Sequence, residues 1–96
     1  MDDQHLFKFY ARLTTRQQQV LQLASAGMTN KEIAQRLYIA PSVVAGHLSI
    51  IYSELGTLEF FAQAQPNRYT LMLTFPSFFA RYPALKDDAA GASTVG

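Results

Sequence analysis

The chain has 96 residues and a formal charge of +1, with eight Lys and Arg against seven Asp and Glu. This length corresponds to one small domain, and the near balance of charge does not by itself indicate a nucleic-acid-binding protein. The absence of cysteine excludes disulfides and thiolate metal sites. The first residues lack the basic and apolar regions of a secretory signal, and no run of about 18 apolar residues occurs. We therefore expect a soluble, cytoplasmic protein that makes no membrane contact.

Composition divides the chain into four predicted segments. Residues 1–12 form an N-terminal segment that mixes acidic and aromatic side chains, and residues 13–65 form a helical domain with regular helix signals. Residues 66–85 form an extension rich in aromatic side chains and proline, and residues 86–96 form a flexible tail.

Two capping boxes predict the starts of two helices in the domain. In the first, Thr14 stands three residues before Gln17, and in the second, Thr29 stands three residues before Glu32. Gly27 is placed to end the first helix. Residues at helical spacing form the two apolar faces, namely Val20, Leu21 and Ala24 in the first helix and Ile33, Ala34 and Leu37 in the second.

A third helix is predicted over residues 41–55, after a tight turn at residues 38–40. Pro41 suits the first position of a helix, because its missing N–H would have no intrahelical partner there. Gly56 is placed to end the helix. One apolar stripe is expected, formed by Val44, Leu48, Ile51 and Leu55. Two short helices joined by a tight turn and braced by a preceding helix form a helix-turn-helix arrangement.

The segment after Gly56 gives weaker signals. Residues 58–64 could form a fourth short helix, and residues 77–82 could form a last helical turn or two. Residues 69–75 alternate polar and apolar side chains and predict a short strand, although a lone strand needs a partner. The aromatic side chains of this part are more often core than binding surface, and we expect some to meet a second copy. They are Phe60, Phe61, Phe75, Phe78, Phe79 and Tyr82.

Residues 13–56 resemble the LuxR/NarL-type (GerE-like) helix-turn-helix domain. Matches in register occur in three blocks: Leu13, Thr14, Arg16, Val20 and Leu21; then Gly27, Thr29, Asn30, Lys31, Glu32, Ile33, Ala34 and Leu37; then Ile39, Val44, His47, Ile51, Leu55 and Gly56. The resemblance implies an all-α fold, a small helical bundle with a helix-turn-helix. In addition to this bundle, we expect an irregular, aromatic-rich C-terminal extension that could include a short strand.

The resemblance also implies how such a domain would meet DNA. It places Ser42, Ala45, Gly46 and Ser49 toward the major groove and His47 near a phosphate. The departures from the family pattern fall on this same helix: Ala45 stands where the family has Lys, Val43 stands where it has Thr, and residues 41–55 contain no Lys or Arg.

The four groove positions share one helix face, because they are spaced by three, one and three residues. All four side chains are small, whereas base reading normally uses Arg, Lys, Asn or Gln. Contacts to the DNA backbone would then come from Arg12, Arg16, Lys31 and Arg36, helped by the N–H groups at the start of the second helix. The predicted DNA-binding residues are Arg16, Thr29, Asn30, Lys31, Arg36, Ser42, Val43, Ala45, Gly46, His47 and Ser49.

The sequence leaves two functions open. The first is a transcriptional regulator that binds double-stranded DNA as a homodimer. The family's fourth helix commonly dimerises, so Leu58, Phe61 and Ala62 are the interface candidates. The alternative is a protein-interaction adaptor or anti-activator, in which the small face packs against a partner helix and DNA binding is lost. The small face could also reflect sequence drift at a surface that no longer has a function. Lys31 could be a solvated surface residue without a binding role, and His47 could be an interior residue with its hydrogen bonds satisfied.

Catalysis finds no support in the sequence. The chain has no cysteine nucleophile, no glycine-rich phosphate loop and no pair of His residues at metal-binding spacing. We therefore predict that the protein is not an enzyme and needs no cofactor or metal.

Overall fold

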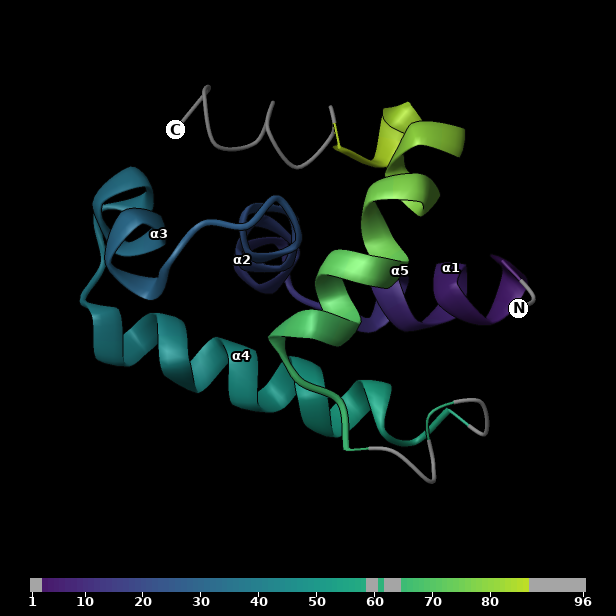
Figure 1. Cartoon of the computed structure of the whole chain (residues 1–96), viewed down its shortest axis with the longest axis horizontal. Coiled ribbons are helices and arrows are strands. Elements are labelled where there is room, and N and C mark those ends of the chain that lie inside the picture. Colours follow the sequence, from purple (N-terminus) through teal and green to yellow (C-terminus); the bar gives the residue numbers. More distant parts are fainter. Residues whose placement is uncertain (1–2, 59–60, 62–64, 87–96) are drawn as a thin grey trace.

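The computed structural model describes residues 3–58, 61 and 65–86, which form an all-α arrangement (Figure 1). The helices are α1 (Asp3–Arg12), α2 (Thr15–Ser25), α3 (Asn30–Leu37), α4 (Pro41–Leu55) and α5 (Arg68–Arg81). Residues 83–86 add a helical turn after α5. The described ranges contain no strand, and none of their helices is long and apolar enough to cross a membrane. The predicted all-α class is confirmed.

The starts of α2 and α3 follow the two capping boxes. The Thr14 hydroxyl accepts a hydrogen bond from the Gln17 backbone N–H at 3.2 Å, and the Gln17 side-chain oxygen accepts one from the Thr14 N–H at 3.0 Å. Thr29 and Glu32 make the same reciprocal pair at 3.2 and 2.8 Å. These bonds satisfy N–H groups that a helix start leaves without intrahelical partners. Gly27 follows α2 with a φ of 95°, which glycine adopts without steric cost.

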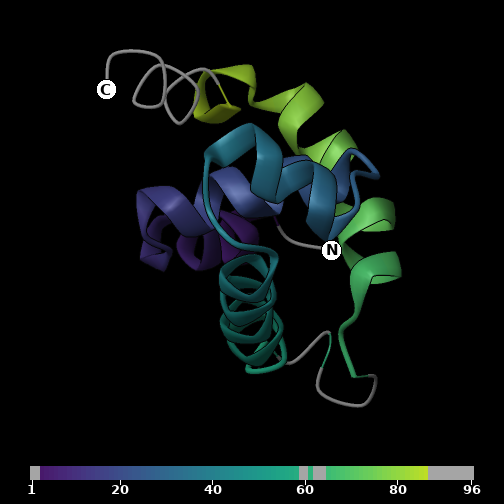
Figure 2. The same ribbon diagram turned by 90° about the vertical axis from the view of Figure 1, so that its left-hand side faces the viewer.

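A tight turn joins α3 to α4, as predicted. Tyr38 ends α3 in the left-handed conformation, with φ 57° and ψ 45°, and its backbone N–H donates to the Ala34 carbonyl. Pro41 is the first residue of α4, and Ala40 before it offers no side-chain cap. Figure 2, which looks nearly along α4, shows α2 and α3 on the same side of this helix. The two helices of the helix-turn-helix are therefore supported by α2.

The helix α2 is the centre of the fold, because α3, α4 and α5 all pack against it (Figure 1). Every apolar face predicted for the helix-turn-helix is buried: Val20, Leu21, Ala24, Ile33, Ala34, Leu37, Val44, Leu48, Ile51 and Leu55. Full burial of a Val, Leu or Ile side chain contributes about 1.5–3 kcal/mol. This core fixes which face of α4 remains turned outward.

The strand predicted over residues 69–75 is wrong, because these residues belong to α5. Asn67 begins the helix with a capping box, since its side chain accepts from the Thr70 N–H at 3.2 Å and the Thr70 hydroxyl accepts from the Asn67 N–H at 3.1 Å. The buried residues Leu71, Phe75, Phe78 and Phe79 are spaced by four, three and one, which is helical spacing. The prediction failed because polar and apolar residues alternate over these seven positions, as they do in a strand. The residues that contact the core instead lie on one face of a helix.

Pro76 lies inside α5 and is exposed. Proline lacks the N–H that would bond to the carbonyl four residues earlier, so it weakens a helix interior. Buried aromatic residues stand on both sides of it, Phe75 before it and Phe78 and Phe79 after it. Packing of these rings keeps the helix continuous across the proline.

Aromatic contacts join α5 to α1, which are far apart in sequence. The ring centres of Phe9 and Phe75 lie 5.7 Å apart, and those of Tyr10 and Phe79 lie 5.5 Å apart in an edge-on arrangement. Phe7 contacts the Tyr82 ring at 4.4 Å. The prediction that the aromatic residues of the extension are mainly core is confirmed for those the structure describes.

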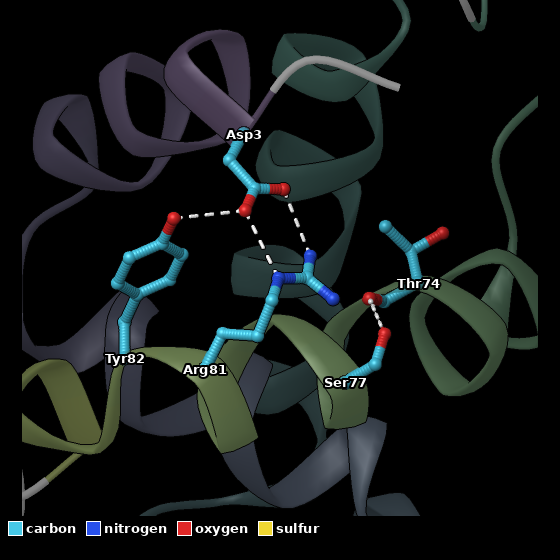
Figure 3. A network of polar contacts seen from close by, with 5 residues as sticks. All are labelled: Asp3, Thr74, Ser77, Arg81 and Tyr82. Carbon is cyan, nitrogen blue, oxygen red and sulfur yellow. Dashed lines mark hydrogen bonds and ion pairs between the residues drawn. The ribbon is translucent and has the colours of Figure 1, made fainter.

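A polar network also ties the start of α1 to the end of α5 (Figure 3). The Arg81 guanidinium donates to both carboxylate oxygens of Asp3, at 2.9 and 2.8 Å, and the Tyr82 hydroxyl donates to Asp3 at 2.9 Å. The hydrogen bonds from Arg81 and Tyr82 lower the pKa of the Asp3 carboxyl below its ordinary value. The same bond to Asp3 raises the pKa of Tyr82.

Parts of the sequence predictions lie outside the described residues. Of the short helix proposed for residues 58–64, the structure describes residues 58 and 61, and residues 87–96 of the proposed tail are outside as well. The four-segment division of the chain stays a prediction.

Candidate nucleic-acid interface

The groove-facing positions expected on α4 form one open stripe. Ser42, Ala45, Gly46 and Ser49 are all exposed, while the opposite side of the helix is buried in the core. A Cβ atom placed on Gly46 would meet no atom within 4 Å. Within the described residues, the stripe is therefore free to receive a partner. These four residues are called the small stripe below.

Larger side chains border the small stripe. Val43 and Ile50 are 44% and 48% exposed. His47 is half-buried, between the exposed and core-facing sides of α4. This partial burial agrees with either reading of its role, a phosphate contact or an interior residue. The helix carries no Lys or Arg, so its charged groups are limited to Glu54 and, when protonated, His47.

The start of α3 carries Thr29, Asn30 and Lys31. The Thr29 side chain and backbone are both occupied by the capping box. Hydrogen bonds with the Thr29 backbone and side chain lower the pKa of the Glu32 carboxyl. Lys31 is exposed. The first-turn N–H groups of Asn30 and Lys31 point out of the helix end, as N–H groups do at the start of any α-helix.

The other predicted backbone-contacting residues lie elsewhere. Arg36 is exposed in the last turn of α3, at the opposite end from Lys31. Arg16 donates to the Leu37 carbonyl at 3.4 Å and so satisfies a carbonyl at the end of α3. Arg12 forms an exposed ion pair with Glu54 at 3.8 Å, a kind of contact that contributes little to stability. Arg36 is therefore an exposed cation on α3, whereas Arg16 also has a structural contact.

Arg68, the first residue of α5, was missed as a candidate by sequence reasoning. Its guanidinium donates to the Met28 carbonyl and to the Asn30 side-chain oxygen, so it lies at the start of α3. It also lies near Tyr52 of α4: burial raises the pKa of the Tyr52 hydroxyl, and the adjacent Arg68 opposes part of this shift. No local signal could have found this, because Arg68 and Asn30 are 38 residues apart.

The predicted dimer residues do not gather on an open surface. Leu58 is half-buried against the core, Phe61 is only 7% exposed, and Ala62 lies outside the described residues. Larger exposed apolar side chains occur on α5, where Tyr69 is 74% and Leu73 is 79% exposed.

The described residues contain no group of three or more His, Asp or Glu side chains arranged to hold a metal ion.

The family of the chain follows from a match over its helix-turn-helix. Residues 11–59, just over half of the chain, match the family described as bacterial regulatory proteins, luxR family. The chain belongs to the LuxR family. This match contains α2, α3 and α4 complete, and it confirms the resemblance found over residues 13–56. The extension that forms α5 lies outside it.

Known relatives match over the same region. A protein of Mycobacterium tuberculosis, named provisionally as an HTH-type transcriptional regulator, is 40% identical over 47 residues, which is 49% of this chain. The HTH-type transcriptional regulator AlkS of Alcanivorax borkumensis is 51% identical over 43 residues, or 45% of this chain. The matched segment spans only 5% of the length of each relative. No solved structure matches the chain significantly.

Proposed function

We propose that this LuxR-family chain is a transcriptional regulator that binds duplex DNA, with α4 in the major groove and α3 crossing the phosphate backbone. The observation that carries the proposal is the exposed small stripe on the second helix of a LuxR-family helix-turn-helix. In helix-turn-helix proteins that helix reads base edges, while the first helix crosses the backbone. The family is a class of regulatory proteins and not a class of enzymes.

The small stripe would restrict how α4 contacts the bases of DNA. Ser42 and Ser49 can form hydrogen bonds with base edges only at close range, and Ala45 can contact a thymine methyl group. Gly46 presents no side chain, so the helix axis could approach the groove floor closely. With few long polar side chains, base specificity should be modest. Most of the affinity should come from contacts to phosphates.

Cations and N–H groups of α3 would supply those contacts. The exposed Lys31 and Arg36 can each neutralise a phosphate, and the N–H groups at the start of α3 favour an anion. Because few cations are present, binding should be weak and its salt dependence shallow. Each neutralised phosphate adds about 0.9 to the slope of log K against log salt concentration.

Fluorescence anisotropy with a labelled mixed-sequence duplex tests the proposal. The protein is titrated at low and moderate salt, together with the double variants Lys31→Ala with Arg36→Ala and Lys8→Ala with Lys86→Ala. Each double variant removes two exposed positive charges, so net charge is matched. Lys8 lies on α1 and Lys86 follows α5, so neither belongs to the helix-turn-helix formed by α3 and α4.

We expect salt-sensitive binding that the first double variant weakens and the second leaves nearly unchanged. Equal losses in both variants would indicate attraction by net charge alone. Binding that survives Lys31→Ala with Arg36→Ala would reject this arrangement of contacts. No binding to any duplex at low salt would reject the function itself.

A homodimer and a cytoplasmic location are further parts of the proposal. A dimer would recognise half-sites about one helical turn of DNA apart. Exposed Tyr69 and Leu73 on α5 support an association surface better than Leu58 and Phe61 do. Light scattering at tens of micromolar protein tests this directly, and a monomer at that concentration would remove the dimer from the proposal.

A second candidate function is docking of a protein helix on the small stripe. Its support is the exposure of Val43 and Ile50, which would give apolar borders to such a contact. Glycine and other small residues let two helices approach closely. Salt separates the two functions, because apolar helix packing should not weaken as salt rises, whereas DNA binding must.

A further inference from the structure

Arg68 brings a guanidinium group from the extension to the start of α3. It is the first residue of α5 and lies outside residues 11–59, which carry the family match. Its side chain donates to the Met28 carbonyl, just before α3, and to the side-chain oxygen of Asn30, the first residue of α3. These two bonds hold the cation in one position at the edge of the helix-turn-helix.

The same guanidinium also contacts Tyr52 of α4. Its neighbour Tyr52 is half-buried and stands seven residues after Ala45, which is about two helical turns. Tyr52 and Ala45 therefore lie along the same edge of α4. Arg68 therefore joins the start of α3 to the Tyr52 position of α4, on the helix edge that continues from Ala45.

The electrostatics of this position favour an anion. A cation at the start of a helix faces the positive end of the helix dipole, so the arrangement is unfavourable unless a negative group is near. The carboxylate of Glu32 is engaged in the capping box with Thr29. Arg68 has five N–H donors, so its contacts to Met28, Asn30 and the Tyr52 hydroxyl leave two for a further acceptor. A phosphate could therefore meet the guanidinium and the first-turn N–H groups of α3 together.

We propose that Arg68 is a phosphate-binding residue of the DNA interface, supplied by the C-terminal extension to a recognition helix that has no Lys or Arg. The inference rests on the proposed DNA binding. It gives the extension a role in binding beyond packing on α2, because folding of α5 places the cation.

The salt dependence of duplex binding tests the inference on the full chain. The wild type is compared with Arg68→Gln, Arg68→Lys and the control Arg81→Gln, which removes an arginine from the other end of α5. We expect Arg68→Gln to lower the slope of log K against log salt concentration by about 0.9, the loss of one phosphate contact. Arg68→Lys should retain the slope, and Arg81→Gln should leave it unchanged.

A purely structural role for Arg68 gives a different result. Loss of the bonds to Met28 and Asn30 would lower the melting temperature of Arg68→Gln, followed by circular dichroism, but would leave the salt slope unchanged. That outcome, with salt-sensitive binding by the wild type, rejects this inference and leaves the proposed function standing. No salt-sensitive binding by the wild type rejects both.

A measurement on the wild-type protein covers the case in which Arg68→Gln does not fold. The side-chain Nε–H signals of the arginines are followed by NMR as duplex is added. We expect the Arg68 signal to shift and the Arg81 signal to stay in place. An unchanged Arg68 signal at saturating duplex would overturn the inference.

Discussion

Replacing Gly46 with alanine should make the protein more stable. Gly46 lies within α4, where glycine costs about 0.8–1.0 kcal/mol relative to alanine because it loses more backbone freedom on folding. The added Cβ would meet no atom within 4 Å, so no clash offsets the gain. For a domain of this size, about 1 kcal/mol corresponds to a rise of roughly 4–8 °C in Tm.

Gly27→Ala is the matched control, with the opposite sign expected. An added Cβ there would lie 3.9 Å from the Met72 side chain, which is an ordinary contact. The φ of 95°, however, is unfavourable for alanine, so the variant should lose about 1 kcal/mol or more. Urea denaturation followed by circular dichroism measures both variants.

The two readouts of Gly46→Ala separate stability from recognition. If α4 approaches DNA as closely as the small stripe allows, the added methyl group should weaken duplex binding although the fold is more stable. A variant that is no more stable than the wild type would refute the structural reasoning. It would mean that another part of the chain, or a second copy, covers Gly46 in solution.

Other changes should have equally defined outcomes. Tyr38→Gly should stabilise the protein by about 1 kcal/mol in urea denaturation, because Tyr38 is 95% exposed and has a left-handed backbone that glycine adopts freely. Phe75→Ala should destabilise it by about 3–5 kcal/mol in the same assay, because this α5 ring is fully buried and contacts Phe9 of α1. A loss under about 1 kcal/mol would contradict this packing. Asp3→Asn should remove a pH-dependent part of the stability. The hydrogen bonds from Arg81 lower the pKa of Asp3 in the folded state below its ordinary value of 3.8. The ionised Asp3 therefore stabilises the folded wild type at pH values above 3.8. This stabilisation is lost as the pH falls through the lowered pKa of the folded state. Unfolding free energies of wild type and Asp3→Asn should therefore differ at pH 6 and converge in strong acid, and a constant difference would contradict the linkage.

The sequence predicted the helix-turn-helix well because its signals are local. The capping boxes at Thr14 and Thr29 act within three residues, and Pro41 marks a helix start by its own geometry. The apolar stripe of α4 has a spacing that only a helix presents on one face. These features, together with the family pattern, were sufficient to locate α2, α3 and α4 and the exposed stripe.

The extension was harder because its signals conflict. Residues 69–75 alternate like a strand, and Pro76 weakens a helix interior. The capping pair of Asn67 and Thr70 is a local signal for a helix start that competes with this alternation. The helix itself is stabilised by burial of Phe75 and its neighbours against α1 and α2, which sequence spacing alone does not specify.

Sequence by itself therefore determined the family, the helix-turn-helix and the absence of positive charge from residues 41–55, because each depends on residues close together in the chain. Only the tertiary structure decided that α5 packs on α2, that Asp3 meets Arg81 across 78 residues, and that Arg68 reaches Asn30 across 38. The physical reason is that these contacts depend on how buried helix faces fit together. A guanidinium can serve a distant helix only after that packing has placed it there.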